Sequence, residues 1–598
     1  MRRLVVADHP GAPRGLLELL SSQGEVEGLD LPFWEDSCLS RAMRLHGLPR
    51  MQQLAAVAHA DRLLGLLRAA LRRTGSGDEE WLYFRQVLET HAVTPLAEGV
   101  ALVACAVERL RPEEIVAVQD VAARDFWSGQ AVAGYAARMA ARAAGIPTRP
   151  LAVINGRPRL LAPLAMKLAP LIRTLAIMAN GAVTLRHLRA AAARGAGRAM
   201  EPADVLMLAG GPVVERLAMK LAGKLSERSL RCFLLADPPA AGRPTRDGFV
   251  AMGAAALMEG RAPKVTETLG ARGRAARIIR ELRSKVDAGE AEALWPRLVS
   301  LEARERPLHR WLAADAEAVL EAVKPRVVVA FQFYPRRATP YLVAARKRGL
   351  PTICCQHGLI ASLDYPVEWY DRLLVFNQHT AEIAGQAAHG AEIAVVGNPA
   401  LDGLVGAPPE PARPARAGER PVVVVATQPN DVPGVERRPE WWFRHVARAA
   451  SSCGAYLAVK LHPDQAAGVH GKMYERTMEA AGAAGEIIEH GQVGLGNLIA
   501  GGDVFVSQFS SSILEALVLE RPVVFVEMRE GPPFYPFDDF GAATRVTRPE
   551  EMEKALREAL RRGPALVPAS FVDRHLAPLD GKALERMAEE IARVCEGP

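Results

Sequence analysis

Few cysteines occur in this 598-residue sequence, and none of the seven belongs to a Cys-x-x-Cys pair. An odd, scattered set is neither a disulfide framework nor a zinc site, and it is typical of a protein in a reducing cytosol. Gly-x-Gly-x-x-Gly loops are absent, which disfavours a nicotinamide-dependent enzyme. The fourteen histidines show no HxH or HxxxH spacing, so the sequence predicts no bound metal and no cofactor.

Excess charge of one sign and long apolar runs are scarce as well. With 74 Lys and Arg against 68 Asp and Glu, the net charge is +6, and aromatic residues make up 6%. This balance, without an RNA- or DNA-binding motif, disfavours a nucleic-acid partner but permits phosphorylated substrates or anionic lipid. The apolar run before Asp8 has only four residues and is not a signal peptide. Segment 160–181 contains Lys167, Arg173 and two prolines, which predict a buried kinked helix, with an in-plane membrane helix as the alternative.

Strand–helix–strand units repeat along the chain. Apolar runs at 113–120, 203–211 and 324–333 each precede a helical segment and a further strand. Continuous apolar runs are typical of parallel strands that are buried on both faces. Two of the helices end in Ala-Arg-x-x-Gly-[Ile/Leu]-Pro-Thr, which places Gly145 and Gly349 where a positive φ is needed, before a proline that stops the helix. The recurrence indicates a shared βαβ pattern, and an internal duplication stays open.

Composition also divides the chain into parts. Segment 406–420 is rich in Pro, Ala and Arg without periodicity, which predicts a linker. Beyond it, strands and helices alternate regularly, as in a doubly wound α/β domain. We therefore predict an α/β fold with an N-terminal α/β extension (1–200), a first domain (201–405), the linker (406–420), a second domain (421–580) and a closing helix (581–598).

Polar residues collect where the predicted strands end, and ligands of open parallel sheets bind beyond these carboxyl ends. Five such clusters at five strand ends indicate one ligand crevice. They are Cys355-Gln356-His357-Gly358, Gly397-Asn398-Pro399 with Asp402, Thr427-Gln428-Pro429, Lys460-Leu461-His462-Pro463-Asp464, and Ser507-Gln508-Phe509-Ser510-Ser511-Ser512 with Glu515.

The serine cluster at 510–512 is a candidate anion site. It lies at the start of a helix, where free N–H groups and the helix dipole favour a phosphate or carboxylate. The alternative is a serine N-cap in which Ser512 and Glu515 form a capping box.

Two histidines at strand tips are candidates for phosphate binding or proton transfer. Pro463 biases His462 toward an extended conformation, from which the ring can bind a phosphate or supply a proton to it. Lys460, two residues earlier in an extended run, shares its face. Beside Gly358, which lets the backbone approach a ligand closely, His357 is a candidate general base for an acceptor hydroxyl. For both histidines the alternative is a structural role in a turn.

Three further features are predicted to be structural. A tight turn is favoured over a phosphate-binding turn at Gly210-Gly211. The adjacent Cys354 and Cys355 are expected to pack within a strand. The acidic doublet Asp538-Asp539 is expected to belong to a loop and not to a metal site.

The polar clusters at the strand ends, in their order along the chain, resemble those of the GT-B glycosyltransferases, in which two Rossmann-like domains face a substrate cleft. The resemblance covers about 320–560. More specifically, this part resembles bacterial capsule and surface-polysaccharide transferases and the related CDP-glycerol glycerophosphotransferases. It rests on a strand-end His-Gly, a Gly-x-Pro-x-x-Asp segment, a Lys-x-His-Pro turn and a Ser-Ser helix, here His357-Gly358, Gly397 to Asp402, Lys460 to Pro463, and Ser511-Ser512 with Glu515. The last match is inexact, because the carboxylate follows three residues after Ser512. Residues 1–200 resemble no family.

The resemblance implies a metal-independent enzyme that transfers a sugar from a nucleotide-activated donor to a surface or capsular glycan, free or lipid-linked. A CMP-sugar is favoured because the His-Pro and Ser-rich segments are also similar to those of bacterial sialyltransferases. The implied catalytic residues are His357 and His462. The implied donor-site residues are Asn398, Gln428, Lys460, Pro463, Ser510, Ser511, Ser512 and Glu515, and Gln356 and Gly358 lie on the acceptor side. We expect a cytoplasmic protein with peripheral contact to the inner face of the plasma membrane.

Two other interpretations stay open. A CDP-glycerol-type glycerophosphotransferase or an enzyme like UDP-N-acetylglucosamine 2-epimerase would share the fold and similar turns. A non-catalytic partner in polysaccharide assembly or export would keep the fold without the chemistry. Donor screening separates them, since an epimerase needs no acceptor.

Overall fold

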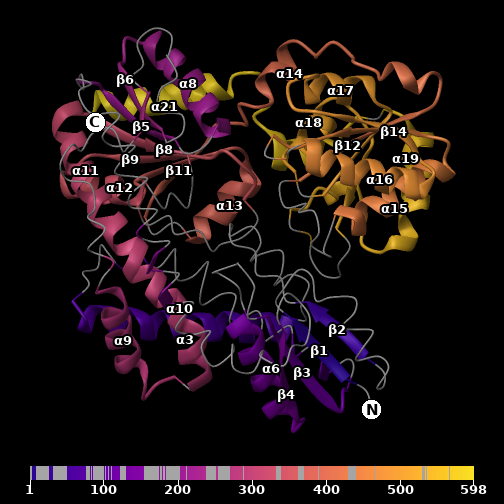
Figure 1. The fold of residues 1–598 in the computed structure, drawn as a ribbon. Helices are drawn as coiled ribbons and strands as arrows, with labels where there is room; N and C mark the ends of the chain where they lie inside the picture. Colours follow the sequence, from indigo (N-terminus) through magenta and orange to yellow (C-terminus); the bar gives the residue numbers. More distant parts are fainter. Residues whose placement is uncertain are drawn as a thin grey trace. The chain divides into compact units, whose positions relative to one another are not determined.

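A computed structural model gives the fold of the chain (Figure 1). It describes 3–7, 26–30, 50–75, 111–120, 130–153, 202–209, 212–236, 251–253, 270–286, 288–331, 338–360, 369–387, 390–428, 439–463, 467–508, 510–527, 535–564 and 566–597, with single residues or pairs between 81 and 108, between 174 and 182, and at 268, 465 and 533. The chain forms two compact units. The first comprises Met1–Ile353, Trp369–Asp371 and Val594–Pro598, and the second comprises Cys354–Glu368 and Arg372–Arg593.

The N-terminal part contains a four-stranded sheet in the order β2-β1-β3-β4, and its strand pairs are parallel. Its strands are β1 (Arg3–Ala7), β2 (Val26–Asp30), β3 (Glu114–Asp120) and β4 (Thr148–Val153), and the helices of this part are α3 (Arg50–Arg73) and α6 (Gln130–Ala144). This part of the chain therefore has the parallel α/β organisation that the sequence predicts.

A seven-stranded sheet follows in the order β11-β10-β9-β8-β5-β6-β7. Its strands are β5 (Val205–Ala209), β6 (Cys232–Ala236), β7 (Ala251–Gly253), β8 (Val327–Ala330), β9 (Thr352–Cys355), β10 (Arg372–Val375) and β11 (Glu392–Val395). The helices between them are α8 (Pro212–Ser226), α9 (Ala271–Leu282), α10 (Ala288–Ser300), the π-helix η4 (Leu301–Glu305), α11 (Arg306–Val323), α12 (Thr339–Lys347) and α13 (Gln378–Ala387). Every side chain of β5, β8 and β9 is buried, as their apolar runs predict.

The third sheet has six strands in the order β14-β13-β12-β15-β16-β17, and all its pairs are parallel. Its strands are β12 (Val422–Ala426), β13 (Tyr456–Lys460), β14 (Ala484–Ile488), β15 (Val504–Ser507), β16 (Val523–Val526) and β17 (Thr544–Val546). Figure 1 shows α17 (Leu495–Gly501) and α18 (Ser512–Val518) on one side of it, and α15 (Pro439–Ser452), α16 (Lys472–Ala481) and α19 (Met552–Arg562) on the other. This strand order is that of a Rossmann-like, doubly wound sheet, so the predicted fold class is confirmed.

The two helices that share the Ala-Arg-x-x-Gly ending have the same geometry. Gly145 and Gly349 have φ of 68° and 69°. The amide of Ile146 donates to the carbonyl of Ala141 (2.9 Å), and that of Leu350 donates to the carbonyl of Ala345 (3.0 Å). These are the long hydrogen bonds of a Schellman ending, in which only a left-handed residue lets the chain reverse onto the helix. The prediction for both glycines is confirmed.

The Pro-rich segment 407–420 is anchored along the second unit. It contains one short helical turn, η5 (Ala415–Ala417). The amide of Ala412 donates to Asn497 O of α17 (2.8 Å), and the Asn497 side chain donates to Glu410 O (2.9 Å). A Cβ on Gly501 would lie 2.4 Å from Ala412 O, so a glycine is needed where this segment passes α17.

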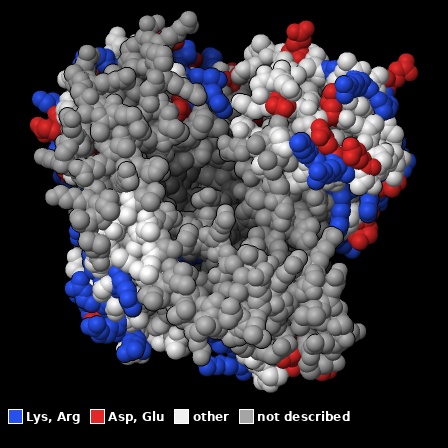
Figure 2. Space-filling view, in the orientation of Figure 1, with Lys and Arg blue, Asp and Glu red and all other residues white. Residues whose placement is uncertain are grey.

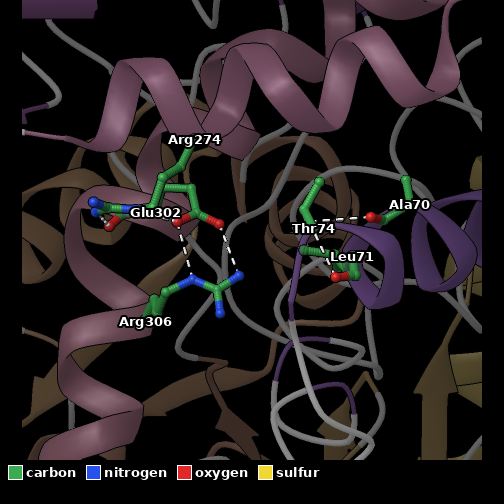
Figure 3. Close-up of polar contacts among 6 residues, drawn as sticks. All are labelled: Ala70, Leu71, Thr74, Arg274, Glu302 and Arg306. Carbon is green, nitrogen blue, oxygen red and sulfur yellow. Dashed lines mark hydrogen bonds and ion pairs between the residues drawn. The ribbon is translucent and has the colours of Figure 1, made fainter.

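Buried charges join helices of the first unit (Figure 3). The Arg306 guanidinium donates to both carboxylate oxygens of Glu302, each at 2.9 Å, and Arg274 Nε donates to the same carboxylate at 2.8 Å. Glu302 belongs to η4 and is almost fully buried, so its two arginines compensate the charge that burial would otherwise penalise. At the end of α3, Thr74 Oγ1 donates to the carbonyls of Ala70 and Leu71 (Figure 3).

Candidate functional site

The carboxyl ends of β12, β13 and β15 lie side by side in the third sheet. Ala426 pairs with Lys460, and Val425 pairs with Val506, so the polar residues that follow these strands meet at one edge. The strand order reverses between β12 and β15, which is the point where doubly wound sheets bind ligands. There the Gln428 side chain donates to Ser507 Oγ (3.3 Å), and Ser507 Oγ donates to Ala426 O (3.0 Å).

A buried glutamine that the sequence analysis missed, Gln465, connects two of these strand ends. Its Nε2 donates to Gln428 O (2.7 Å), and its Oε1 accepts from the His462 amide (3.2 Å) and from the Thr427 hydroxyl. The His462 amide also donates to Thr427 Oγ1 (2.9 Å). The backbone amide of His462 is therefore held by two side chains, those of Thr427 and Gln465. The only signal for Gln465 in the sequence is its position three residues after His462.

Lys460, the last residue of β13, is buried with 7% of its surface exposed. Its Nζ donates to Glu489 O (2.6 Å), just beyond the end of β14. Burial lowers the pKa of Lys460, because desolvation disfavours the ammonium ion. An ammonium group has three N–H donors, so this anchor positions the charge and leaves donors for a ligand. Pro463 follows in the exposed turn after β13.

The serine cluster lies at the start of helix α18, as predicted, but without the capping box that was the alternative to an anion site. Helix α18 begins at Ser512 with Ser511 as its N-cap residue, and the Ser511 side chain forms no capping hydrogen bond. The hydroxyls of Ser510 and Ser512 lie 2.6 Å apart, and the Ser512 amide donates to Ser510 Oγ (3.3 Å). The capping box between Ser512 and Glu515, which was the alternative to an anion site, does not form, because Ser512 lies inside the helix and its hydroxyl contacts that of Ser510.

Glu515 lies in α18 and is half-buried. Desolvation raises the pKa of its carboxyl group to about 7. A substantial fraction of the group is therefore protonated near neutral pH, and a neutral carboxyl both donates and accepts hydrogen bonds. Protonation also removes the repulsion that a carboxylate would exert on an anionic ligand nearby.

The turn after β9 is shaped by Gln356, which is buried. Its Nε2 donates to Gly358 O (2.7 Å), and its Oε1 accepts from the amide of Phe376 (2.6 Å). The amide group thus holds the turn to the end of β10. His357, in the middle of the turn, is exposed. As predicted, Cys354 and Cys355 are buried within β9, and burial raises the pKa of the Cys355 thiol.

The Gly397–Asp402 segment docks the C-terminal helix α21 (Ala583–Glu596). The Asp402 carboxylate accepts from the amides of Ala583 (3.0 Å) and Leu584 (2.9 Å), the first two residues of α21. Asn398 Oδ1 accepts from the Ala400 amide (3.0 Å), which closes the local turn. The shape of the segment follows from these contacts, and the assignment of Asn398 to the donor site stays a prediction.

A second buried cluster, missed in the sequence, surrounds His575 of the π-helix η9 (Val572–Leu576). His575 Nδ1 lies 3.2 Å from Tyr535 Oη, and its Nε2 lies 3.0 Å from Asp539 Oδ2. The ring of His379 lies 4.8 Å from that of His575. Burial, with the neighbouring His575 and Arg574, lowers the pKa of His379 to about 4. Asp539 lies in the short turn η7 (Asp539–Gly541), consistent with the predicted loop.

Some predicted features lie outside the described residues. These are Gly210-Gly211, Pro429, Asp464, Phe509 and most of segment 160–181. Among the described helices, none is long and apolar enough to cross a membrane. The described side chains of His, Cys, Asp and Glu include no group of three that could hold a metal ion.

No protein-family model matches the sequence, and no curated protein matches it. Solved structures with some similarity include UDP-GlcNAc 2-epimerase from Methanocaldococcus jannaschii, at 12% identity and a TM-score of 0.40 over 65% of this chain and 99% of that chain. MnaA from S. aureus, in a co-structure with UDP, has 14% identity and a TM-score of 0.43 over 66% and 96%. Acinetobacter baumannii MurG has 14% identity and a TM-score of 0.38 over 65% and 99%. These values describe a distant similarity, and the fold class rests on the sheets described above.

Proposed function

We propose that the chain is a glycosyltransferase that moves a sugar from a nucleotide-activated donor to a surface or capsular glycan, free or lipid-linked. The observation that supports this most is the polar edge at the β12–β15 switch point. There, Gln428, Ser507 and the backbone of His462 are held in one hydrogen-bonded network, with Lys460 anchored beside them. A preorganised set of donors with one positive charge suits the phosphates of a nucleotide.

In the proposed mechanism, negative charge develops on the phosphate of the departing nucleotide. Lys460 and the hydroxyls of Ser510 to Ser512 stabilise that charge, and Asn398 and Gln428 add donors for the nucleotide. His462 supplies a proton to the leaving phosphate. A protonated Glu515 donates a further hydrogen bond without repelling the phosphate.

On the acceptor side we propose His357 as the general base. It is exposed, so a large glycan can reach it, and the Gln356–Gly358 bond keeps the turn in one conformation. We assign acceptor binding to 201–405, donor binding to 421–580 and an unassigned role to the extension 1–200. A CMP-activated sugar remains the donor that we propose, on the resemblance of the His-Pro and Ser-rich segments.

A thermal-shift panel of CMP, CDP, UDP, GDP and ADP on the full chain tests the proposal. A ligand at about 100 times its dissociation constant stabilises the folded protein by about 2.7 kcal/mol. We expect CMP to stabilise the protein, and we expect His462→Ala and Lys460→Met to abolish that shift. His445→Ala, which changes a histidine on α15 that the proposed mechanism does not use, is the matched control.

The other outcomes separate the alternatives. Stabilisation by UDP, with turnover of a UDP-sugar that needs no acceptor, would identify an epimerase. A selective response to CDP would favour glycerophosphate transfer. A chain that responds to none of the five nucleotides would refute the donor site and favour a non-catalytic partner in polysaccharide assembly.

A further inference from the structure

Helix α9 carries a row of exposed cations that the proposed reaction does not use. Its buried face consists of Ala271, Ala275, Ile278 and Leu282. At 100° per residue, the exposed Arg272, Arg277, Arg280 and Arg283 fall on the other side, within an arc of about 140°. They extend along about 16 Å of helix, and the exposed Lys285 follows.

The acidic groups near α9 do not neutralise this row. Arg274, the remaining arginine of the helix, binds the buried Glu302 (Figure 3). Glu281, the one acid in 270–286, binds Arg73 of α3 at 2.6 Å. Arg272, Arg277 and Arg280 form no ion pair with any residue that the structure describes in this unit.

Helix α3 extends the positive surface, because it packs against α9. Arg62, Arg68, Arg72 and Arg73 of α3 are exposed. Two of these four are paired with acids, Arg62 with the buried Glu290 and Arg73 with Glu281, and Arg62 also donates to Lys285 O (3.4 Å). Segments 50–75 and 270–286 together contain eleven Lys and Arg but only two acids, whereas the whole chain has a net charge of +6. Figure 2 shows Lys and Arg gathered at the lower left, where Figure 1 draws these helices.

We propose that this α3–α9 surface binds the headgroups of anionic phospholipids and holds the protein on the membrane that carries its acceptor. The choice of partner rests on the proposed function, because a lipid-linked glycan is presented at a membrane. It agrees with the chemistry of α9, which has no aromatic side chain on which nucleic-acid bases could stack. Cations on a surface attract an anionic bilayer nearly independently of one another, so no fixed pairing geometry is required.

Vesicle flotation of the full chain, without nucleotide, tests this proposal. We expect binding to vesicles that contain phosphatidylglycerol, little binding to pure phosphatidylcholine, and weakening as the Debye length falls from about 10 Å at 0.1 M salt to about 3 Å at 1 M. Replacing Arg272, Arg277, Arg280 and Arg283 with glutamine removes four charges and keeps good helix formers. The partition constant is expected to fall at least about a hundredfold.

The matched control replaces four exposed cations of α19 with glutamine, namely Lys554, Arg557, Arg561 and Arg562. It has the same change in net charge and should bind vesicles as the wild type does. Equal loss in both variants, or equal binding to neutral vesicles, would overturn the proposal. Displacement of the vesicles by a short RNA or DNA duplex that binds more tightly would identify a nucleic-acid surface instead. Nucleotide thermal shifts measured on the same variants report separately on the donor site.

Discussion

Replacing Asp402 with alanine is expected to loosen helix α21 without unfolding the neighbouring sheets, because the aspartate begins the short helix α14 (Asp402–Gly406). The carboxylate accepts the amides of Ala583 and Leu584, which have no partner within their own helix. It also places a negative charge at the positive end of the helix dipole. Both effects are lost in Asp402→Ala, whereas Asp402→Asn keeps an oxygen acceptor and loses only the charge.

The magnitude follows from these two contacts. Loss of an N-cap side chain costs about 1–2 kcal/mol, and the lost charge adds about 0.3–1 kcal/mol. If α21 opens locally, a change of 1–2 kcal/mol speeds its amide exchange by about 5–30-fold. Gly397→Ala should have a larger effect. Its Cβ would lie 2.8 Å from Pro578 O and 2.9 Å from Ala583 Cβ, and the residue has a φ of 90°.

Hydrogen–deuterium exchange read by mass spectrometry on peptides that cover α21 is the assay. Exchange should speed up most in Gly397→Ala and least in Asp402→Asn. Glu553→Ala, which breaks an exposed pair with Arg557 on α19, is the control and should leave α21 unchanged. If α21 in Asp402→Ala exchanges at the wild-type rate, the carboxylate does not hold the helix and the reasoning fails.

Two pH-dependent effects of opposite sign are also expected. The pKa of His379 is lowered from 6.5 to about 4 in the folded state, so the unfolded chain binds the proton first, and stability falls as the pH drops from 6.5 to 4. The loss is about 2 kcal/mol after discounting the shift for partial exposure of the ring, and the urea midpoint of His379→Gln should change less over this range. Burial raises the pKa of Asp315 to about 7, although a hydrogen bond from Tyr341 opposes the shift. Stability should therefore fall as the pH rises from about 4 to 7. The melting temperature of Asp315→Asn should depend less on pH over this range, and a dependence equal to that of the wild type would contradict this.

Local patterns in the sequence determined most of the secondary structure. The run of valines in β12 predicts a strand buried on both faces, and all five of its side chains are buried. Gly145 and Gly349 predict left-handed helix endings from a motif of eight residues, because a Schellman ending involves only neighbours in the chain. Likewise, the polar residues after β12, β13 and β15 could be placed at one edge, because parallel strands end on the same side of a sheet.

The tertiary structure alone decided the partners of these residues. Asp402 caps a helix that begins 181 residues later in the chain, and Asp539 meets His575 across 36 residues. Gln465 carries no distinguishing pattern, yet it joins Thr427, Gln428 and His462. The Ser512–Glu515 spacing left a capping box open as an alternative, but the helix begins at Ser512, and the Ser512 hydroxyl contacts that of Ser510. A hydrogen bond depends on a few tenths of an ångström and on direction, and packing of distant segments sets both, so spacing along the chain does not determine them.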